Sequence, residues 1–208
     1  MSEDKAWNAA LQVEEWAGEL RVNLIRAASI AAFYGQHLFN YYVMKDPFEA
    51  SYHLAVTAIS IAWVTVGVAL HVCLSRRFRP EWLSYGATGA DLFLVTILLM
   101  VSDGPKSSLL VLYLLVVATT AVRLDLRLVR AATLMAAVGY GAIIVHSYEY
   151  REAWIVSRHH QVIFTLAIGC AGLLAGQSVR RAKRLAKDYH DRLEFLARNQ
   201  GASQGAKA

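Results

Sequence analysis

Six long apolar segments, joined by short loops, dominate this sequence. One helical crossing of a lipid bilayer takes about 20 residues that are mostly apolar. The sequence therefore predicts an all-α, polytopic membrane protein built as a six-transmembrane-helix bundle. The predicted spans are Leu24–Met44, Leu54–Leu74, Trp82–Ser102, Ser107–Val122, Val129–Ser147 and Gln161–Val179.

The spans leave little room for a second domain in a chain of 208 residues, of which 56% are hydrophobic. A further globular domain usually needs about 50 residues or more, and no stretch between or beside the spans reaches that length. The acidic start, with Glu3 and Asp4, is unlike a cleavable signal peptide. We expect a cytoplasmic amphipathic segment over residues 1–22, the transmembrane domain over 23–179, a cytoplasmic helix over 180–199 and a disordered tail over 200–208.

Basic residues are distributed unevenly between the two predicted sides of the membrane. The side that holds both termini carries 17 of the 21 lysines and arginines, whereas the other side carries only Lys45, Lys106, Arg151 and Arg158. Loops rich in Lys and Arg stay in the cytoplasm, so we expect both termini there, in a bacterial inner membrane. The net charge of +5 then faces anionic lipid headgroups, and a nucleic-acid partner is not needed to explain it.

Both ends of the chain carry apolar residues at helical spacing. Before the first span, the spacing predicts an amphipathic helix at the inner membrane surface. After the sixth span, a similar stripe predicts a short parallel coiled coil, and so a homodimer or a subunit of a larger membrane complex. The first set is Trp7, Leu11, Trp16 and Leu20, and the second is Leu185, Tyr189, Leu193 and Leu196.

Asp91 lies near the middle of the third predicted span. An ionisable group at that depth costs at least a few kcal/mol unless it is paired, and no Lys or Arg lies at a matching depth in the predicted spans. One interpretation is a neutral aspartate that donates a hydrogen bond to Thr88, Thr119 or Tyr140. The other is an intramembrane switch residue, or a proton or cation site.

Five histidines fall in the outer half of the predicted bundle or in its outer loops. Imidazole is a common ligand of transition metals, so these residues are candidates for a ligand or metal site. We single out His37 and His146 as the candidate ligands of a divalent metal or a single haem. The alternative is a set of interfacial histidines that face water or lipid headgroups. The five are His37, His53, His146, His159 and His160.

The chain resembles the six-span membrane receptor modules that precede the output domains of bacterial histidine kinases, membrane adenylate cyclases and planctomycete-type serine/threonine kinases. By this resemblance Asp91, His37 and the GPKSS turn belong to the part that senses a ligand or metal, and the last span continues into a signalling helix. We expect no output domain after that helix. The matching stretches are RVNLIRAASIAAFYGQHLFNYY, RRFRPEWLSYGATGADLFLVTILLM, DGPKSSLLVLYLL and HHQVIFTLAIGCAGLLAGQSVRRAKRLA.

Three function classes follow from these features. The first is a non-enzymatic sensor or interaction module that signals through its C-terminal helix. The second is an accessory subunit of a membrane redox complex that contacts haem or quinone. The third, a small transporter, is disfavoured because the two halves of the sequence show no repeat. We do not expect an enzyme, since the HExxH motif does not occur in the sequence.

Overall fold

The computed structural model describes residues 3–44, 50–76 and 82–205. Helices make up almost all of this described chain, and it contains no strand, as predicted. The long helices are α1 (Glu3–Phe39), α2 (Ala50–Ser75), α3 (Trp82–Val101), α4 (Val111–Thr120), α5 (Leu126–Tyr150) and α6 (Arg158–Gly205). The short elements are the π-helical turn η1 (Asn40–Met44) and the 3₁₀ turns η2 (Gly104–Lys106), η3 (Ser108–Leu110), η4 (Ala121–Arg123) and η5 (Glu152–Trp154).

Four of these helices are long and apolar enough to cross a membrane. They are α2, α3, α5 and the Arg158–Tyr189 part of α6, and a shorter apolar stretch, Ser108–Arg123, contains α4. The protein is therefore a helical protein with several candidate transmembrane helices. The first and fourth predicted spans are not among the four long ones in the described part of the chain.

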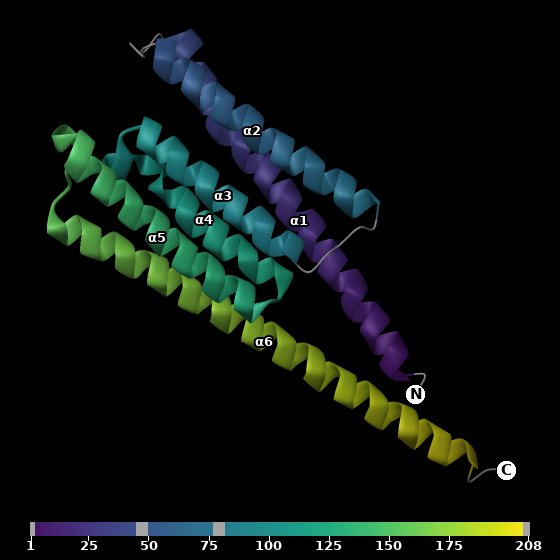
Figure 1. The fold of residues 1–208 in the computed structure, drawn as a ribbon. Helices are drawn as coiled ribbons and strands as arrows, with labels where there is room; N and C mark the ends of the chain where they lie inside the picture. The colour runs from purple at the N-terminus through teal and green to yellow at the C-terminus, as the bar shows by residue number, and fades with distance from the viewer. Residues whose placement is uncertain (1–2, 45–49, 77–81, 206–208) are drawn as a thin grey trace.

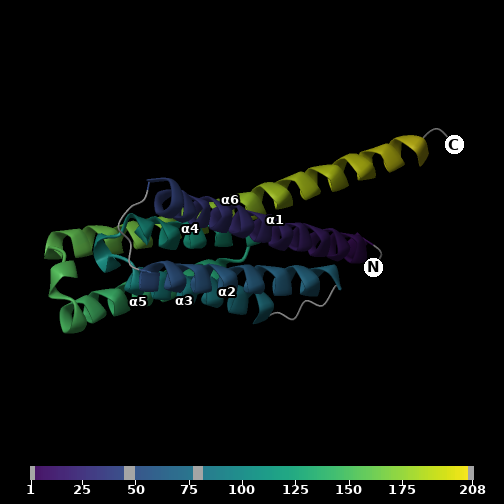
Figure 2. The same cartoon turned by 90° about the horizontal axis from the view of Figure 1, so that it is seen from above.

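The helices form two layers, with α2, α3 and α5 in one and α1, α4 and α6 in the other (Figures 1 and 2). The start of α1 and the end of α6 project from the same end of the molecule. The core lies between the layers, where Val95, Leu99, Tyr113 and Val117 have no solvent exposure. The Tyr113 hydroxyl shares a hydrogen bond of 2.7 Å with Thr96 Oγ1, which satisfies this buried polar group.

The first helix differs from its prediction. α1 runs without a break from Glu3 to Phe39, so residues 6–21 continue directly into the first predicted span and do not form a separate helix. Gly18 permits α1 to approach η4 closely, because a Cβ atom there would lie only 3.0 Å from the Val122 carbonyl oxygen. The side chains of Trp7, Leu11 and Trp16 lie outside the described residues.

The last helix is longer than predicted. α6 extends to Gly205, where the sequence predicts a disordered tail from residue 200. Each added residue gains one backbone hydrogen bond once a helix has formed, which favours continuation of a long helix. Leu185 and Tyr189 are 61% and 67% exposed on this helix. Leu193 and Leu196, the other two residues of the predicted stripe, have side chains outside the described set.

α5 and α6 pack closely at Gly172. A Cβ atom on Gly172 would overlap with Thr133 Oγ1 and lie 2.7 Å from Thr133 Cγ2, whereas a Cβ atom on Gly169 would meet nothing within 4 Å. We therefore expect Gly172→Ala to destabilise the protein by about 1–3 kcal/mol through overpacking. Gly169→Ala is the matched control and should be neutral or slightly stabilising, since alanine favours helix. Unfolding in mixed detergent micelles measures both, and equal stability of the two variants would contradict this packing.

Candidate functional site

The buried partner of Asp91 is Arg26. Arg26 Nε donates to Asp91 Oδ1 (2.8 Å), and Arg26 Nη2 donates to Asp91 Oδ2 (2.6 Å). This two-bond arrangement is the strong form of the arginine–carboxylate contact. Trp63 Nε1 on α2 also donates to Asp91 Oδ1 (2.8 Å). The expectation that no basic residue reaches Asp91 is therefore wrong.

The three neighbours predicted for Asp91 have other roles. Thr88 donates to the Ser84 carbonyl oxygen, and Thr119 donates to the Val116 carbonyl oxygen. Tyr140 is buried against the Phe164 ring, and its hydroxyl has no hydrogen-bond partner in the described part of the chain. The sequence could not identify Arg26, because numbering along each helix does not show how far α1 and α3 are shifted along each other.

Asn23 extends the ion pair to α2. Arg26 Nη1 donates to Asn23 Oδ1 (2.7 Å), and Asn23 Nδ2 donates to the Gly67 carbonyl oxygen (3.3 Å). The side chains of Arg26 and Asp91 are only 5% and 10% exposed. Because the charges are taken out of water, the pair needs these additional hydrogen bonds to be tolerated. The network therefore ties α1 to both α2 and α3.

A second buried ion pair holds α1 nearer its start. Arg123 Nε in η4 lies 3.0 Å from Glu19 Oε2, although its N–H bond is not aimed at that oxygen. Arg123 Nη1 also donates to Thr88 Oγ1 (2.5 Å) and to the Ser84 carbonyl oxygen (3.2 Å). The Ser84 hydroxyl donates to Glu19 Oε1. This pair therefore joins α1, α3 and η4.

The two ion pairs have one helix in common. Glu19 and Arg26 lie seven residues apart on α1, which is two turns or about 10 Å along one face. That spacing indicated in the sequence that both charges need partners, since two opposite charges on one face of a helix require partners when the face is buried. The four charges of Glu19, Arg26, Asp91 and Arg123 cancel, so the buried network is neutral.

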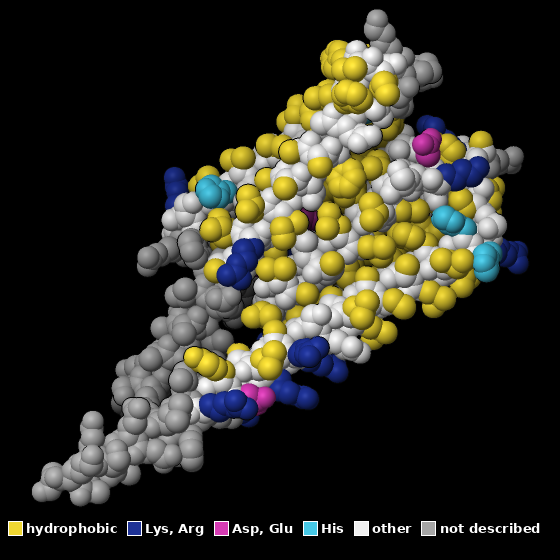
Figure 3. Space-filling model, turned by 180° about the vertical axis from the view of Figure 1, so that it is seen from behind, with side chains coloured by type: hydrophobic (Ala, Val, Ile, Leu, Met, Phe, Trp, Pro, Cys, Tyr) yellow, Lys and Arg dark blue, Asp and Glu magenta, His cyan; other side chains and the backbone are white. Residues whose placement is uncertain are grey.

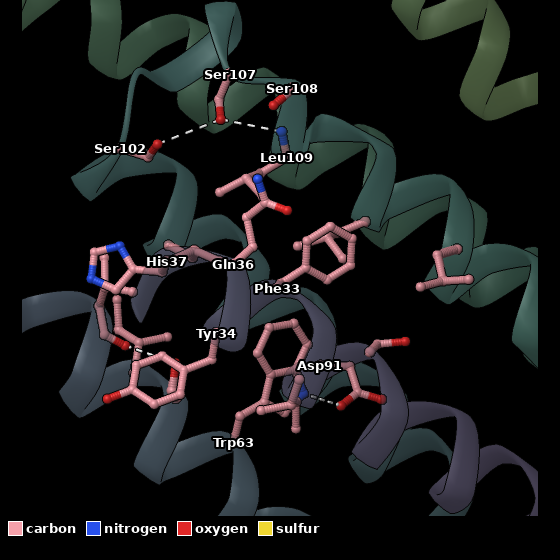
Figure 4. Close-up of a pocket in the computed structure, with 18 of the residues that line it drawn as sticks. Phe33, Tyr34, Gln36, His37, Trp63, Asp91, Ser102, Ser107, Ser108 and Leu109 are labelled. Atoms are coloured by element: carbon pink, nitrogen blue, oxygen red, sulfur yellow. Dashed lines mark hydrogen bonds between the residues drawn. The ribbon is translucent and has the colours of Figure 1, made fainter. Parts of the chain in front are cut away.

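A cavity of about 680 Å³ lies between α1 and α4. Its inner end is formed by Arg26, Asp91 and Trp63, and its outer end reaches His37 and the turn at Ser107. Figure 4 shows Trp63 directed at Asp91, and Gln36 extending from α1 toward the turn. The volume is typical of a small-molecule binding site. The cavity therefore joins Asp91, His37 and the GPKSS turn in one site.

The outer end of the cavity is bordered by unusual backbone. The π-helical turn begins at Asn40, which lines the cavity, and π-helical turns are frequent at functional sites. On the opposite wall, Ser107 caps the short helix η3 by accepting a hydrogen bond from the Leu109 N–H (3.2 Å).

The structure brings together two of the five candidate histidines. His37 Nε2 and His53 Nδ1 lie 3.1 Å apart and share a hydrogen bond, in which one nitrogen donates and the other accepts. Tyr41 stacks on His53 with ring centroids 4.0 Å apart. His37 therefore pairs with a histidine of α2, and not with His146 as we proposed for the metal ligands.

The other candidate histidines lie on the other side of the bundle. His146 packs against Tyr150 on α5, and α3 and α4 separate α5 from α1 (Figures 1 and 2). His159 and His160 are exposed at the start of α6. Among the residues that the structure describes, no three His, Cys, Asp or Glu side chains gather in a metal-binding group.

Comparison with known proteins gives no further guide to this site. No family model, curated protein or solved structure matches the chain.

Proposed function

We propose that this chain is a non-enzymatic membrane sensor module that binds a small ligand between α1 and α4 and signals to a partner through α6. The observation that carries the proposal is the cavity, because it ends at the ion pair that ties α1 to α3. A ligand that favours one position of α1 over another shifts the protein toward that position.

The path from the cavity to α6 consists of packed elements. α1 is joined to η4 by the Glu19–Arg123 pair. η4 in turn packs against α4 and α6. A displacement of α1 therefore reaches α6 through two contacts. The exposed side chains of Leu185 and Tyr189 on α6 supply the surface for a second copy of the chain or for another subunit.

The proposed topology has six spans and both termini in the cytoplasm of a bacterial inner membrane. Its support is the excess of Lys and Arg on the side that holds the termini. In this topology, α1 from residue 24 and the Ser108–Arg123 stretch complete the six spans beside the four long apolar helices. The cavity then lies in the membrane, with His37 and the turn at Ser107 at the outer side.

A cavity-filling side chain tests the coupling without knowledge of the ligand. Leu115 lines the cavity on α4, so tryptophan at this position stands in for an occupied site. We expect Leu115→Trp to change the distance between spin labels at positions 76 and 187. Position 76 directly follows α2 and position 187 lies on α6, and both are exposed. The distance is measured in nanodiscs, with Cys73 and Cys170 replaced by serine and the labelled chain diluted in unlabelled protein.

The matched control is Leu134→Trp, which adds the same side chain at a position on α5 that is 66% exposed. This variant should leave the label distance unchanged. An unchanged distance in Leu115→Trp as well would overturn the sensor proposal. It would favour the alternative, an accessory redox subunit, which needs no coupling between the cavity and α6.

A further inference from the structure

We propose that the cavity binds a neutral, elongated, lipid-like molecule whose carbonyl oxygen accepts a hydrogen bond from Arg26. This inference rests on the proposed function, because it names the ligand class of the same site. Four observations carry it: the unused donors of Arg26, the balance of charge, the length of the cavity and its opening.

Arg26 keeps unused hydrogen-bond donors at the inner end of the cavity. A guanidinium has five N–H bonds. Three of them go to Asp91 and Asn23, which leaves two without an acceptor in the described part of the chain. A buried N–H bond that lacks an acceptor costs about 1–3 kcal/mol. A ligand that brings an acceptor oxygen recovers this cost.

The remaining polar groups at this end do not compete for such an oxygen. Ser29, Ser60 and Thr119 line the cavity, but each hydroxyl donates its proton to a carbonyl of its own helix. The Trp63 N–H is bound to Asp91. Arg26 is therefore the group that selects the ligand, and it selects an acceptor such as a ketone or ester carbonyl.

The charge balance of the lining favours a neutral ligand. The cavity is lined by two basic residues, Arg26 and Lys106, and by two acidic residues, Asp91 and Asp103. An anionic ligand would compete with Asp91 for Arg26, and a cationic ligand would compete with Arg26 for Asp91. Either competition would leave one buried charge without its partner, which is strongly unfavourable. A neutral carbonyl binds without breaking the pair.

The shape of the cavity favours an elongated apolar molecule. The cavity extends along α3 from Asp91 to Ser102, a separation of eleven residues and so about 16 Å. Its walls between these ends include apolar side chains from four helices. They include Ile30, Phe33, Val56, Leu98, Leu112 and Leu115.

The cavity is accessible from an apolar face of the bundle. Figure 3 shows this face with apolar side chains around a recess, and an acidic side chain is visible at the bottom of the recess. In the proposed topology this face contacts lipid. A ligand dissolved in the membrane therefore enters sideways, without first passing through water.

The test uses methyl nonyl ketone, isotopically labelled at its carbonyl carbon, added to proteoliposomes of the full chain. We expect a carbonyl NMR signal shifted downfield from that of the ketone in protein-free liposomes, because a guanidinium N–H polarises the carbonyl. Unlabelled ketone should displace this signal, whereas decanoate and decylammonium should not. The signal should persist in Leu134→Trp and disappear in Leu115→Trp. In Arg26→Lys, which keeps the charge near Asp91 but not the planar fork, the downfield shift should be lost.

The ligand class would be overturned by a signal that matches protein-free liposomes, by one that survives in Leu115→Trp, or by equal displacement with decanoate. These outcomes are separate from failure of the proposed function. If Leu115→Trp moves α6 but the ketone does not bind, the sensor stands and the ligand class is wrong. If the ketone binds but does not change the label distance between α2 and α6, the site stands and the sensor function is wrong.

Discussion

The variant Asp91→Leu is expected to destabilise the folded protein by about 3–5 kcal/mol, which is the usual cost of breaking a buried ion pair by removing one partner. Arg26 would remain in the core as an unpaired cation, and the Trp63 N–H would lose its acceptor. Arg26→Met should cost a similar amount, because it leaves Asp91 unpaired. Reversible unfolding in bicelles or mixed micelles measures both variants.

The double variant Arg26→Met/Asp91→Leu shows whether the single variants lose stability because each leaves one buried charge unpaired. Replacement of a whole buried ion pair by apolar residues of similar volume is often neutral or stabilising, so the double variant should recover most of the lost stability. Arg130→Met is the matched control, because Arg130 is exposed on α5, and it should change stability by less than about 0.5 kcal/mol. Additive losses in the double variant would show that the two side chains are not paired in the folded protein.

Breaking the Glu19–Arg123 pair is expected to have the second large effect. Arg123→Met should also cost about 3–5 kcal/mol, because Glu19 is 6% exposed and would stay buried with the Ser84 hydroxyl as its one remaining partner in the described part of the chain. Loss of Arg123 also removes the hydrogen bonds to Thr88 and Ser84 on α3. The measurement is unfolding under the same conditions, together with amide hydrogen exchange along α1.

Hydrogen exchange separates a local effect from a global one. We expect faster exchange in α1 around Glu19 than in α5 of the same variant, because Arg123 joins α1 to η4. The control is Arg127→Met, since Arg127 is exposed on the same side of the molecule. Unchanged exchange in α1 of Arg123→Met would mean that this pair does not hold the helix.

The sequence predicts the helical architecture well, because apolar runs of about 20 residues in the chain indicate spanning helices directly. It also predicts that Asp91 needs a partner, because an unpaired carboxylate at that depth is costly. It does not identify Arg26 as that partner. The contact depends on the relative shift of α1 and α3, and such a shift arises from packing between helices and not from the pattern within one.

The histidines show the same limit of prediction from the sequence. Depth in the membrane can be estimated from position in a span, and five histidines at similar depth suggested one common site. Depth does not say which face of a helix a residue occupies or which helices are neighbours. His37 and His53 meet because α1 packs on α2. His146 stays apart because α5 lies on the far side of the bundle (Figure 1).

The two charges on α1 also set an order of assembly. The partners of Arg26 and Glu19 lie on α3 and η4, which leave the ribosome after α1. α1 can therefore neutralise its charges only after α3 and η4 are in place. α1 is synthesised before α3 and η4 but reaches its final position after them, and the bundle closes around the cavity when α1 docks.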